Sequence, residues 1–287
     1  MKLYPECGPC MLRRVLMFCE NESEETRYQV VREVCGLFSE RISPDMSTTA
    51  LANERNRILE KITKDSNPMK RLKEESMDAA LELYPRLEER LGGLDEGERF
   101  RTALRMALAG NIIEFGARDH QVNLDRLEEE IMEIVEGKPE IDDSDEIYGR
   151  VKKAGRILYV TDNAGELVLD KIFINELRNY ADVTVAPLSR PVQDDASVED
   201  VKRVGIDGDI LPRGDFIGVW FERTPEEFQK AWKDADLIIA KGMACYETLV
   251  DRTDILKGKV ALLMKAKCRP VADDIGVPVG ATVVKLL

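Results

Sequence analysis

The sequence predicts an α/β protein: a three-layer α/β/α domain with a mostly parallel sheet, preceded by an all-helical N-terminal domain. Two observations support this prediction. Apolar residues recur at three- and four-residue spacing in the first half, whereas short β-branched runs alternate with amphipathic segments in the second. Between the halves, residues 136–146 form an acidic, proline-containing stretch typical of a boundary loop. We therefore expect a helical domain or cap at residues 1–149 and an α/β domain at residues 150–287.

The first half contains no convincing alternating strand. Pro44, Ser47 and Thr48 mark a helix start, and the glycine pair at residues 92–93 marks a break. The amphipathic helices expected here span residues 10–19, 25–40, 48–64, 67–83, 98–115 and 124–136.

The second half alternates between strand and helix patterns, which is the arrangement of a parallel sheet with helices on both faces. Strands are expected at residues 157–160, 183–186, 237–240, 260–264 and 282–286, with a weaker candidate at 217–220. Helices are expected at residues 166–179, 198–204, 225–233 and 246–250.

The central stretch of this domain is RILYVTDNAGE at residues 156–166. A buried strand is followed directly by Asp162 and Asn163, and a helix begins near Glu166. Open α/β sheets bind ligands where strands end and helices begin. A carboxylate beside an amide suits a hard cation such as Mg²⁺ or Mn²⁺, and the N–H groups of the helix start favour phosphate. An ordinary turn with Asp162 as helix cap would use the same residues.

Three further strand ends carry acids or lysines. The strand at 183–186 leads to an acidic pair, the strand at 237–240 to a lysine and a glycine, and the strand at 260–264 to two lysines. Because parallel strands end at one edge of a sheet, we expect these side chains to converge. Acids with lysines are what a metal-assisted phosphoryl site requires. The residues concerned are Asp194, Asp195, Lys241, Gly242, Lys265 and Lys267.

Composition excludes several classes of protein. A net charge of −13 argues against a nucleic-acid partner, because phosphate backbones require a basic face. No apolar run reaches the roughly 18 residues of a membrane span, and the N-terminus lacks a signal-peptide core, so we expect no membrane association and a soluble cytoplasmic enzyme. Charged residues make up 34% of the chain, in the direction of the thermophile trend.

Three motifs of known enzyme classes are absent from the chain. It has no GxxxxGK[ST] loop for Walker-type nucleotide binding, no GxGxxG after a strand for dinucleotide binding and no GxSxG nucleophile elbow. His120 is the only histidine, which rules out multi-histidine metal sites, and as a loop residue it is expected to be solvated.

Cys7 and Cys10 form a CxxC just before the first predicted helix. This spacing can serve redox chemistry, half of a metal site, or a structural or disulfide role. A redox motif of this kind normally follows a strand of a βαβ unit, for which the six preceding residues leave no room.

Gly110 and Asn111 interrupt an otherwise strong helix, so close packing of another element is expected there. Asn111 or Glu114 would then face the site from the helical side. Alternatively, Asn111 would cap a neighbouring helix at a helix crossing.

Six motifs, taken together in this order, resemble the metal-dependent damage-control phosphatases, formerly a domain of unknown function. The resemblance is to the archaeal branch whose members begin with a CxxC, and it covers nearly the whole chain. The motifs are CGPC at residues 7–10, GNIIEFG at 110–116, DNAGE at 162–166, RPVQDDA at 190–196, KGMACYETL at 241–249 and KAKC at 265–268.

The resemblance implies a helical region packed on an α/β/α domain. It also implies hydrolysis of small phosphate esters, such as sugar phosphates and damaged metabolites, with a divalent metal: Mn, Ni, Co or Mg. By position, Asp162, Asn163 and Asp195 would be metal ligands, and Asp162 and Lys265 would be catalytic. The residues expected near substrate are Asn111, Glu166, Lys241, Gly242, Glu247 and Lys267, with Asp170 as a supporting residue.

The chain departs from the family pattern at three positions. Cys245 and Asp194 stand where the family usually has Asn, and Glu114 stands where it usually has Asp. Cys245 could favour a softer metal such as Ni²⁺ or Co²⁺, or it could be a buried small residue. Asp194 leaves open which neighbouring acid is the ligand, and Asp195 is chosen because it directly precedes Ala196.

The function expected is therefore a divalent-metal-dependent phosphatase that acts by metal-assisted in-line attack, with water or Asp162 as nucleophile. One alternative is an S-adenosylmethionine-dependent carboxyl methyltransferase, although the glycine-rich first loop of that class is missing. Another is a non-enzymatic metal or redox protein built on Cys7 and Cys10. The oligomeric state is open.

Overall fold

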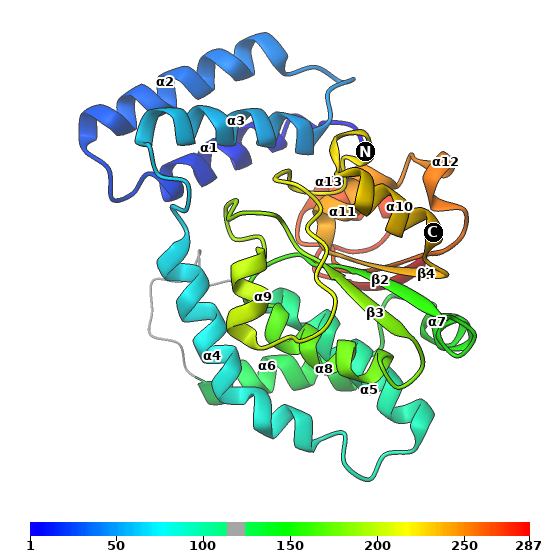
Figure 1. The fold of residues 1–287 in the computed structure, drawn as a ribbon. Helices are drawn as coiled ribbons and strands as arrows, with labels where there is room; N and C mark the ends of the chain where they lie inside the picture. Colours follow the sequence, from blue (N-terminus) through cyan, green and yellow to red (C-terminus); the bar gives the residue numbers. More distant parts are fainter. Residues whose placement is uncertain (114–123) are drawn as a thin grey trace.

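The computed structural model describes residues 1–113 and 124–287. Within these ranges, a sheet of six strands lies between two layers of helices, with a helical lobe beyond it (Figure 1). The strand order is β1-β6-β5-β4-β2-β3, and all neighbours pair in parallel except β5 and β6. The prediction of a mostly parallel sheet is confirmed. The strands are β1 (Ile141–Asp142), β2 (Arg156–Val160), β3 (Asp182–Ala186), β4 (Leu237–Lys241), β5 (Val260–Lys265) and β6 (Thr282–Leu286).

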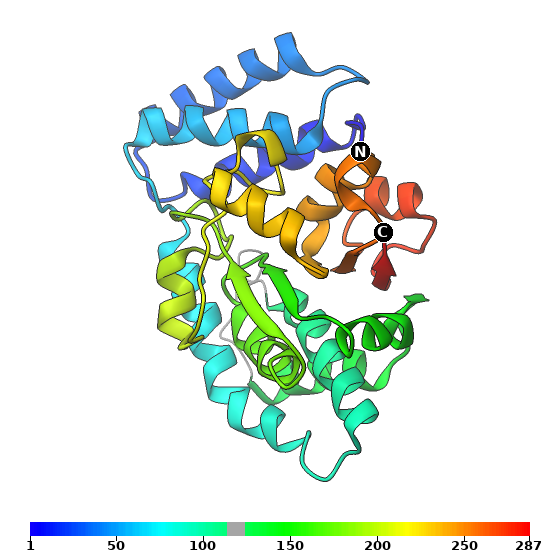
Figure 2. The ribbon, with the colours of Figure 1, turned by 45° about the vertical axis from the view of Figure 1, so that its right-hand side comes forward.

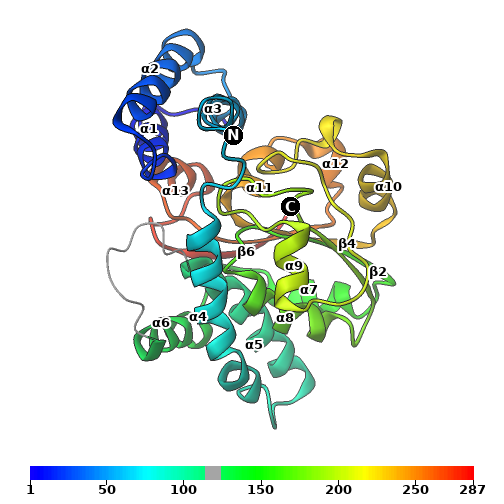
Figure 3. The ribbon, with the colours of Figure 1, turned by 60° about the vertical axis from the view of Figure 1, so that its left-hand side comes forward.

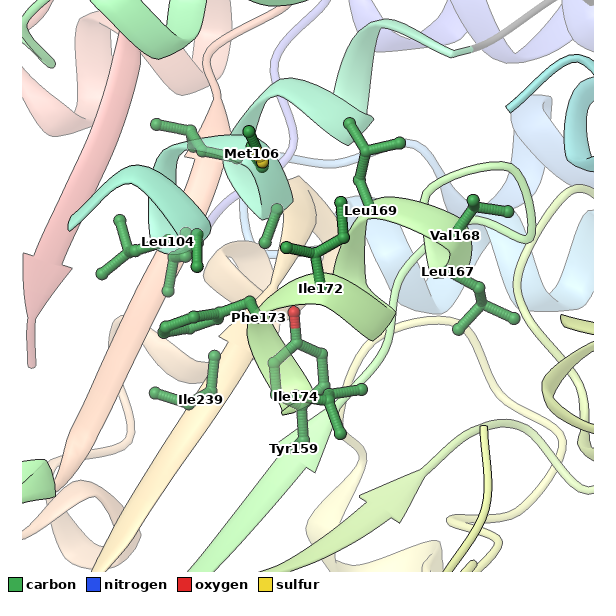
Figure 4. Packing of buried hydrophobic residues seen from close by; sticks show 14 of the residues in the cluster. Leu104, Met106, Tyr159, Leu167, Val168, Leu169, Ile172, Phe173, Ile174 and Ile239 are labelled. Atoms are coloured by element: carbon green, nitrogen blue, oxygen red, sulfur yellow. The ribbon is translucent and has the colours of Figure 1, made fainter. Parts of the chain in front are cut away.

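The larger hydrophobic core lies between one face of the sheet and the layer of helices from α4 to α9. Helix α8 is apolar on most sides because it is buried between the sheet and α5. Figure 4 shows Ile172 and Phe173 of α8 beside Tyr159 of β2 and Ile239 of β4. The helices of this layer are α4 (Lys70–Glu89), α5 (Glu96–Ala109), η1 (Gly110–Ile112), α6 (Leu124–Glu136), α7 (Ser144–Val151), α8 (Leu167–Leu177) and α9 (Val198–Val204).

The opposite face of the sheet carries a second core. Side chains of a strand alternate between faces, so Leu158 and Val160 of β2 point here while Ile157 and Tyr159 point to the larger core. This alternation is why both faces of β2 are apolar. The second layer consists of η3 (Phe221–Arg223), α10 (Glu226–Asp234), α11 (Gly242–Leu249), α12 (Thr253–Leu256) and α13 (Arg269–Ile275).

The N-terminal helices α1 (Cys7–Phe18), α2 (Glu24–Arg41) and α3 (Thr48–Thr63) form a lobe with its own core. Figure 2 shows this lobe, in blue, beside the yellow and orange helices of the second layer, and Thr49 of α3 donates to Glu247 of α11 at 2.9 Å. Its core also takes in residues from the loops after β3, such as Leu188 and Val192. The predicted boundary at residue 149 does not coincide with this division, because α4, α5 and α6 precede it and contribute to the larger core on one face of the sheet.

One predicted strand is wrong: residues 217–220 form bends and coil. The backbone N–H of Ile217 donates to Asn53 Oδ1 at 3.1 Å, and the N–H of Val219 donates to Thr248 Oγ1 at 2.9 Å. Side chains therefore supply the partners that a neighbouring strand would otherwise provide.

Other predicted boundaries also shift. The short strand β1 and helix α7 lie at the stretch predicted to be the boundary loop. Helix α11 begins at Gly242, four residues before the predicted start at residue 246, and α1 begins at Cys7 rather than after the CxxC. None of the helices in the described ranges is long and apolar enough to cross a membrane.

Candidate active site

Two loops at the carboxyl edge of the sheet are joined backbone to backbone. The N–H of Ala196 donates to Asp162 O at 2.7 Å, and the N–H of Ala164 donates to Asp194 O at 2.8 Å. Asn163 and Asp195 consequently form an isolated antiparallel bridge. The loop after β2 and the loop after β3 thus bring together the three predicted metal ligands.

Gly242 lies directly against the Asp162 carboxylate. A Cβ atom at this position would fall 1.8 Å from Asp162 Oδ2, and the backbone has a φ of +80°. Only glycine fits such a close approach in the left-handed region. The carboxylate therefore lies at the N-terminus of α11, where the exposed N–H groups of a helix favour negative charge.

Glu166 is a fully buried carboxylate surrounded by donors. Its Oε2 accepts from Lys241 Nζ at 2.9 Å, and its Oε1 accepts from Asn163 Nδ2 at 2.7 Å and from Asn111 Nδ2. Burial alone would raise its pKa, but the positive charges of Lys241 and Lys267 outweigh this and hold the pKa of Glu166 below its usual value. Glu166 is therefore ionised and fixed in position.

Lys241 is buried at the end of β4 and has three acceptors. Its Nζ donates to Glu166, to Asp170 Oδ1 at 2.7 Å and to Ala107 O at 2.8 Å. The ion pairs outweigh the effect of burial and raise the pKa of Lys241. Since each ammonium proton has a protein acceptor, Lys241 acts on the site through Glu166, and direct contact with a phosphate stays a prediction. Asp170 also accepts from the Tyr159 hydroxyl at 2.7 Å, consistent with a supporting role.

Asn111 reaches the site from η1. This agrees with the first of the two predicted alternatives, in which Asn111 faces the site from the helical side. Its Nδ2 donates to Asp162 Oδ2 at 3.3 Å as well as to Glu166. A Cβ on the neighbouring Gly110 would come within 3.3 Å of Glu166 Cα, so the expected close packing is confirmed. Glu114 and His120 lie outside the described residues.

Asp195 contrasts with Glu166. It is buried, yet its Oδ2 accepts no hydrogen bond, and Arg213 Nη2 lies 3.6 Å from that oxygen. Burial raises the pKa of Asp195 to about 7 against the opposing effect of Arg213. Burial and the charges of Glu166 and Asp195 likewise raise the pKa of Asp162 well above its usual value. The positive charges near this pair, from Lys267, Lys241 and Arg213, therefore do not offset the burial of the two carboxylates.

A divalent cation fits this deficit. Asp162 and Asp195 offer carboxylate oxygens, and Asn163 offers Oδ1 because its Nδ2 is committed to Glu166. Such oxygen donors suit a hard divalent cation. Among the described residues, no three His, Cys, Asp or Glu side chains converge as a ready-made metal group. The candidate set is therefore two carboxylates and one amide, with room in its coordination shell for substrate oxygens.

The two lysines after β5 differ in their relation to this set. The positive charge of Lys267 lowers the pKa of both Asp162 and Glu166, so this lysine lies near the carboxylates. Its backbone N–H donates to Met243 Sδ at 3.3 Å, which ties the loop to α11. Lys265 is the half-buried last residue of β5. Its predicted catalytic role stays a prediction.

Three cations at the site were missed by sequence reasoning. Arg14 of α1 donates to Asp194 at 3.3 Å, Lys73 of α4 donates to Asp195 O at 2.9 Å, and Arg213 pairs with Asp195. No local motif indicates them, because they come from helices and a loop distant from the acids in sequence. Arg14 pairs with Asp194 and Arg213 with Asp195, so the choice of Asp195 over Asp194 as metal ligand stays a prediction.

Other predicted residues lie further from the acids. Glu247 Oε2 accepts from Thr49 Oγ1 at 2.9 Å, so Glu247 faces α3, and Cys7 Sγ lies 3.9 Å from Thr48 Oγ1 on the same helix. Cys10 is exposed, and all six cysteines are free thiols. Cys245 lies nearer to the acids: burial raises the pKa of its thiol to about 12, and the negative charges of Asp162 and Asp195 add to this rise.

Comparison with known proteins assigns the family. The sequence profile described as the damage-control phosphatase ARMT1-like domain matches residues 3–283. The chain belongs to this family. A damage-control phosphatase from Archaeoglobus fulgidus is 33% identical over 298 residues and covers 100% of both chains. One from Pyrococcus horikoshii is 39% identical over 189 residues, 64% of each chain.

A solved structure agrees with this assignment. The crystal structure of a DUF89 family protein from Pyrococcus horikoshii has a TM-score of 0.90 and 31% sequence identity, covering 100% of this chain and 99% of that chain. The resemblance to the damage-control phosphatase family and the predicted fold class are confirmed, and membership in the CxxC-containing branch stays a prediction. The relatives named as phosphatases, both from archaea, support a phosphatase-type function and do not favour the methyltransferase alternative.

Proposed function

We propose that the protein is a divalent-metal-dependent phosphatase that hydrolyses small phosphate esters, such as sugar phosphates or damaged phosphometabolites. The observation that carries the proposal is the buried pair Asp162 and Asp195. Two adjacent strand ends hold these carboxylates together, and Asp195 Oδ2 has no hydrogen-bond donor. A buried carboxylate pair whose nearby positive charges do not offset its burial is stabilised when a further cation joins it.

Asp162, Asn163 and Asp195 would hold the metal. When bound, a divalent cation polarises a phosphoryl oxygen as a Lewis acid. Asn163 presents Oδ1 because Glu166 fixes its amide group, and Glu166 is in turn fixed by Lys241.

The remaining charges suit the phosphoryl group. The charges of Lys267 and Lys241 both reach Asp162, but Lys241 is held by Glu166 and Asp170, so Lys267 is the one placed to offset negative charge that develops on the transferred group. Arg14 brings a guanidinium from the N-terminal lobe to the same edge, on the side of Asp194. A lobe that contributes to the rim in this way would shape the pocket around the alcohol part of the ester.

Two chemical routes fit these residues. Water can attack phosphorus in line with the leaving oxygen, or Asp162 can attack and form an aspartyl-phosphate that is then hydrolysed. In both routes the P–O bond to the alcohol breaks, and the alcohol oxygen takes up a proton. Trapping of a phosphoenzyme on Asp162 would select the second route.

Metal-stripped protein supplied in turn with Mg²⁺, Mn²⁺, Co²⁺ and Ni²⁺ tests the proposal. Hydrolysis of para-nitrophenyl phosphate and of a panel of sugar phosphates is measured beside calorimetric metal binding. We expect metal-restored turnover, and loss of both turnover and metal binding in Asp162→Ala. Asp145→Ala removes an exposed carboxylate of α7 that pairs with Arg101, and should leave both unchanged. Wild-type protein that binds none of these metals, or a fully active Asp162→Ala, would sink the proposal.

A further inference from the structure

Lys73 is a buried lysine of α4 that contacts the loop carrying Asp195. Only 3% of it is exposed, and its Nζ donates to the backbone oxygen of Asp195 at 2.9 Å. The same Nζ forms an ion pair with Asp200 Oδ2 at 2.7 Å. Figure 3 shows α4 beside α9, the helix to which Asp200 belongs. A charge buried this deeply is costly unless it is paired, so these contacts fix Lys73 in one position.

Asp200 links Lys73 to the residues that follow Asp195. Its Oδ2 also accepts from Ser197 N at 2.8 Å and from Ser197 Oγ at 2.6 Å, which forms a capping box at the start of α9. Lys73 and Asp200 together therefore hold the carbonyl of Asp195 and the amide of Ser197. The backbone on both sides of Ala196 is clamped from α4.

This clamp continues to the other metal-binding loop. The N–H of Ala196, which lies between the two clamped groups, donates to Asp162 O at 2.7 Å. A shift of the Asp195 backbone would therefore move both candidate carboxylates relative to each other. Metal affinity depends strongly on groups that orient the ligands without touching the metal.

We propose that Lys73 is a positioning residue that sets the distance between Asp162 and Asp195 through its bond to the Asp195 carbonyl. The inference rests on the proposed metal site. It assigns to α4, a helix distant in sequence from all three candidate ligands, the control of how tightly that site binds its cation.

A matched control comes from the other end of α9. Lys171 Nζ donates to Val204 O at 3.1 Å, so it too bonds a backbone carbonyl that flanks this helix. It contacts neither Asp195 nor the capping box. Lys171→Met therefore measures the general effect of losing a lysine-to-carbonyl bond at α9.

The test variant is Lys73→Met combined with Asp200→Asn. Removal of both charges leaves no unpaired buried carboxylate, and the new amide oxygen can still cap α9 through Ser197. The single variant Lys73→Arg keeps a cationic donor at the same place. Mn²⁺ affinity of the metal-stripped protein is measured by electron paramagnetic resonance at a temperature where circular dichroism shows each variant folded.

We expect Mn²⁺ binding to weaken about 10- to 100-fold in the double variant, the range for groups that orient ligands, with recovery of most of the affinity in Lys73→Arg. Lys171→Met should bind Mn²⁺ like wild type. Equal affinity in wild type and the double variant, or an equal loss in Lys171→Met, would overturn the inference and leave the proposed function standing. Wild-type protein without Mn²⁺ binding would instead overturn the proposed function.

Discussion

Glu166 and Asp195 are buried carboxylates of the same sheet edge with opposite electrostatics. Glu166 accepts from one lysine and two amides, and its pKa is lowered. Asp195 has an oxygen without any donor, and burial raises its pKa to about 7. The difference shows that burial alone does not define the site. Glu166 is ionised because donors surround its carboxylate, whereas the cations near Asp195 do not offset its burial.

The two environments also differ in which elements supply the charge. Lys241 lies on the strand next to β2 in the sheet, so the sheet itself neutralises Glu166. Around Asp195, the cations come from α4 and from the loop that carries Arg213, and only Lys73 makes a hydrogen bond, to the backbone. Lys73 thus holds the backbone of Asp195, and Arg213 offsets only part of the cost of burying its carboxylate. This arrangement suits the proposed role of Asp195 as a metal ligand.

Lys241→Met should have the largest effect on the contrast between Glu166 and Asp195, because it removes the cation paired with Glu166. It would leave Glu166 and Asp170 without their shared cation, and loss of one partner of a buried ion pair costs about 3–5 kcal/mol. We expect the free energy of unfolding, measured by guanidinium titration at pH 7.5, to fall by this amount. Adding Glu166→Gln and Asp170→Asn to Lys241→Met should restore part of it. A loss below about 1 kcal/mol in the single variant would show that Glu166 does not depend on Lys241.

Asp195→Asn should have opposite effects on stability and activity. The side chain keeps its shape but loses the charge that repels Asp162, so metal-free protein should be at least as stable as wild type. Metal-dependent turnover should fall at least ~100-fold, the scale of removing one charge-stabilising group from an active site. Glu166→Gln provides the contrast, because it should destabilise the metal-free protein. A clear loss of stability in metal-free Asp195→Asn would mean that Asp195 is as well paired as Glu166.

The sequence was sufficient to locate the acids but not their neutralising partners. Asp162, Asn163 and Asp195 follow strands whose apolar runs identify them, and parallel strands end at one edge. Lys241 follows the same rule, yet its side chain points inward to α8, because position at a strand end does not fix which way a long side chain turns. Lys73 lies on an amphipathic helix of the first half, and nothing local distinguishes it from a solvated lysine.

The fold, like the site, was predicted only in part from the sequence. Strands with continuous apolar runs were predicted correctly, and β6 was placed without its antiparallel direction, which the sequence pattern does not encode. Strand β1 has only two residues, Ile141 and Asp142, so it shows no periodicity. The separate core of α1 to α3 was not anticipated, because helical periodicity shows that a face is buried but not against which partner.

Asp236 offers the mildest test, at the opposite end of β2. It is exposed, and its Oδ2 accepts from the backbone N–H groups of Arg156 and Gly155 at 2.9 Å each. These two bonds lower the pKa of Asp236, in contrast to Asp195, which lacks such donors. A carboxylate with a lowered folded-state pKa stabilises the fold above its unfolded pKa, and this stability is lost as the pH falls through the folded pKa.

Asp236→Asn should therefore lower the free energy of unfolding at pH 7 by about 1 kcal/mol or less, because solvent screens an exposed group. The difference from wild type should begin to shrink as the pH falls below about 4, where the carboxylate of the unfolded chain takes up a proton, and should vanish only below the lowered folded-state pKa. Denaturant titrations of both proteins at pH 7 and at pH 3.5 measure it, with Asp182→Asn as a control for loss of an exposed charge at the same sheet edge. A difference that stays constant between the two pH values would show that the charge of Asp236 does not contribute to the free energy of unfolding. Hydrogen-bond donors alone would then not explain which carboxylates of this sheet are stabilised.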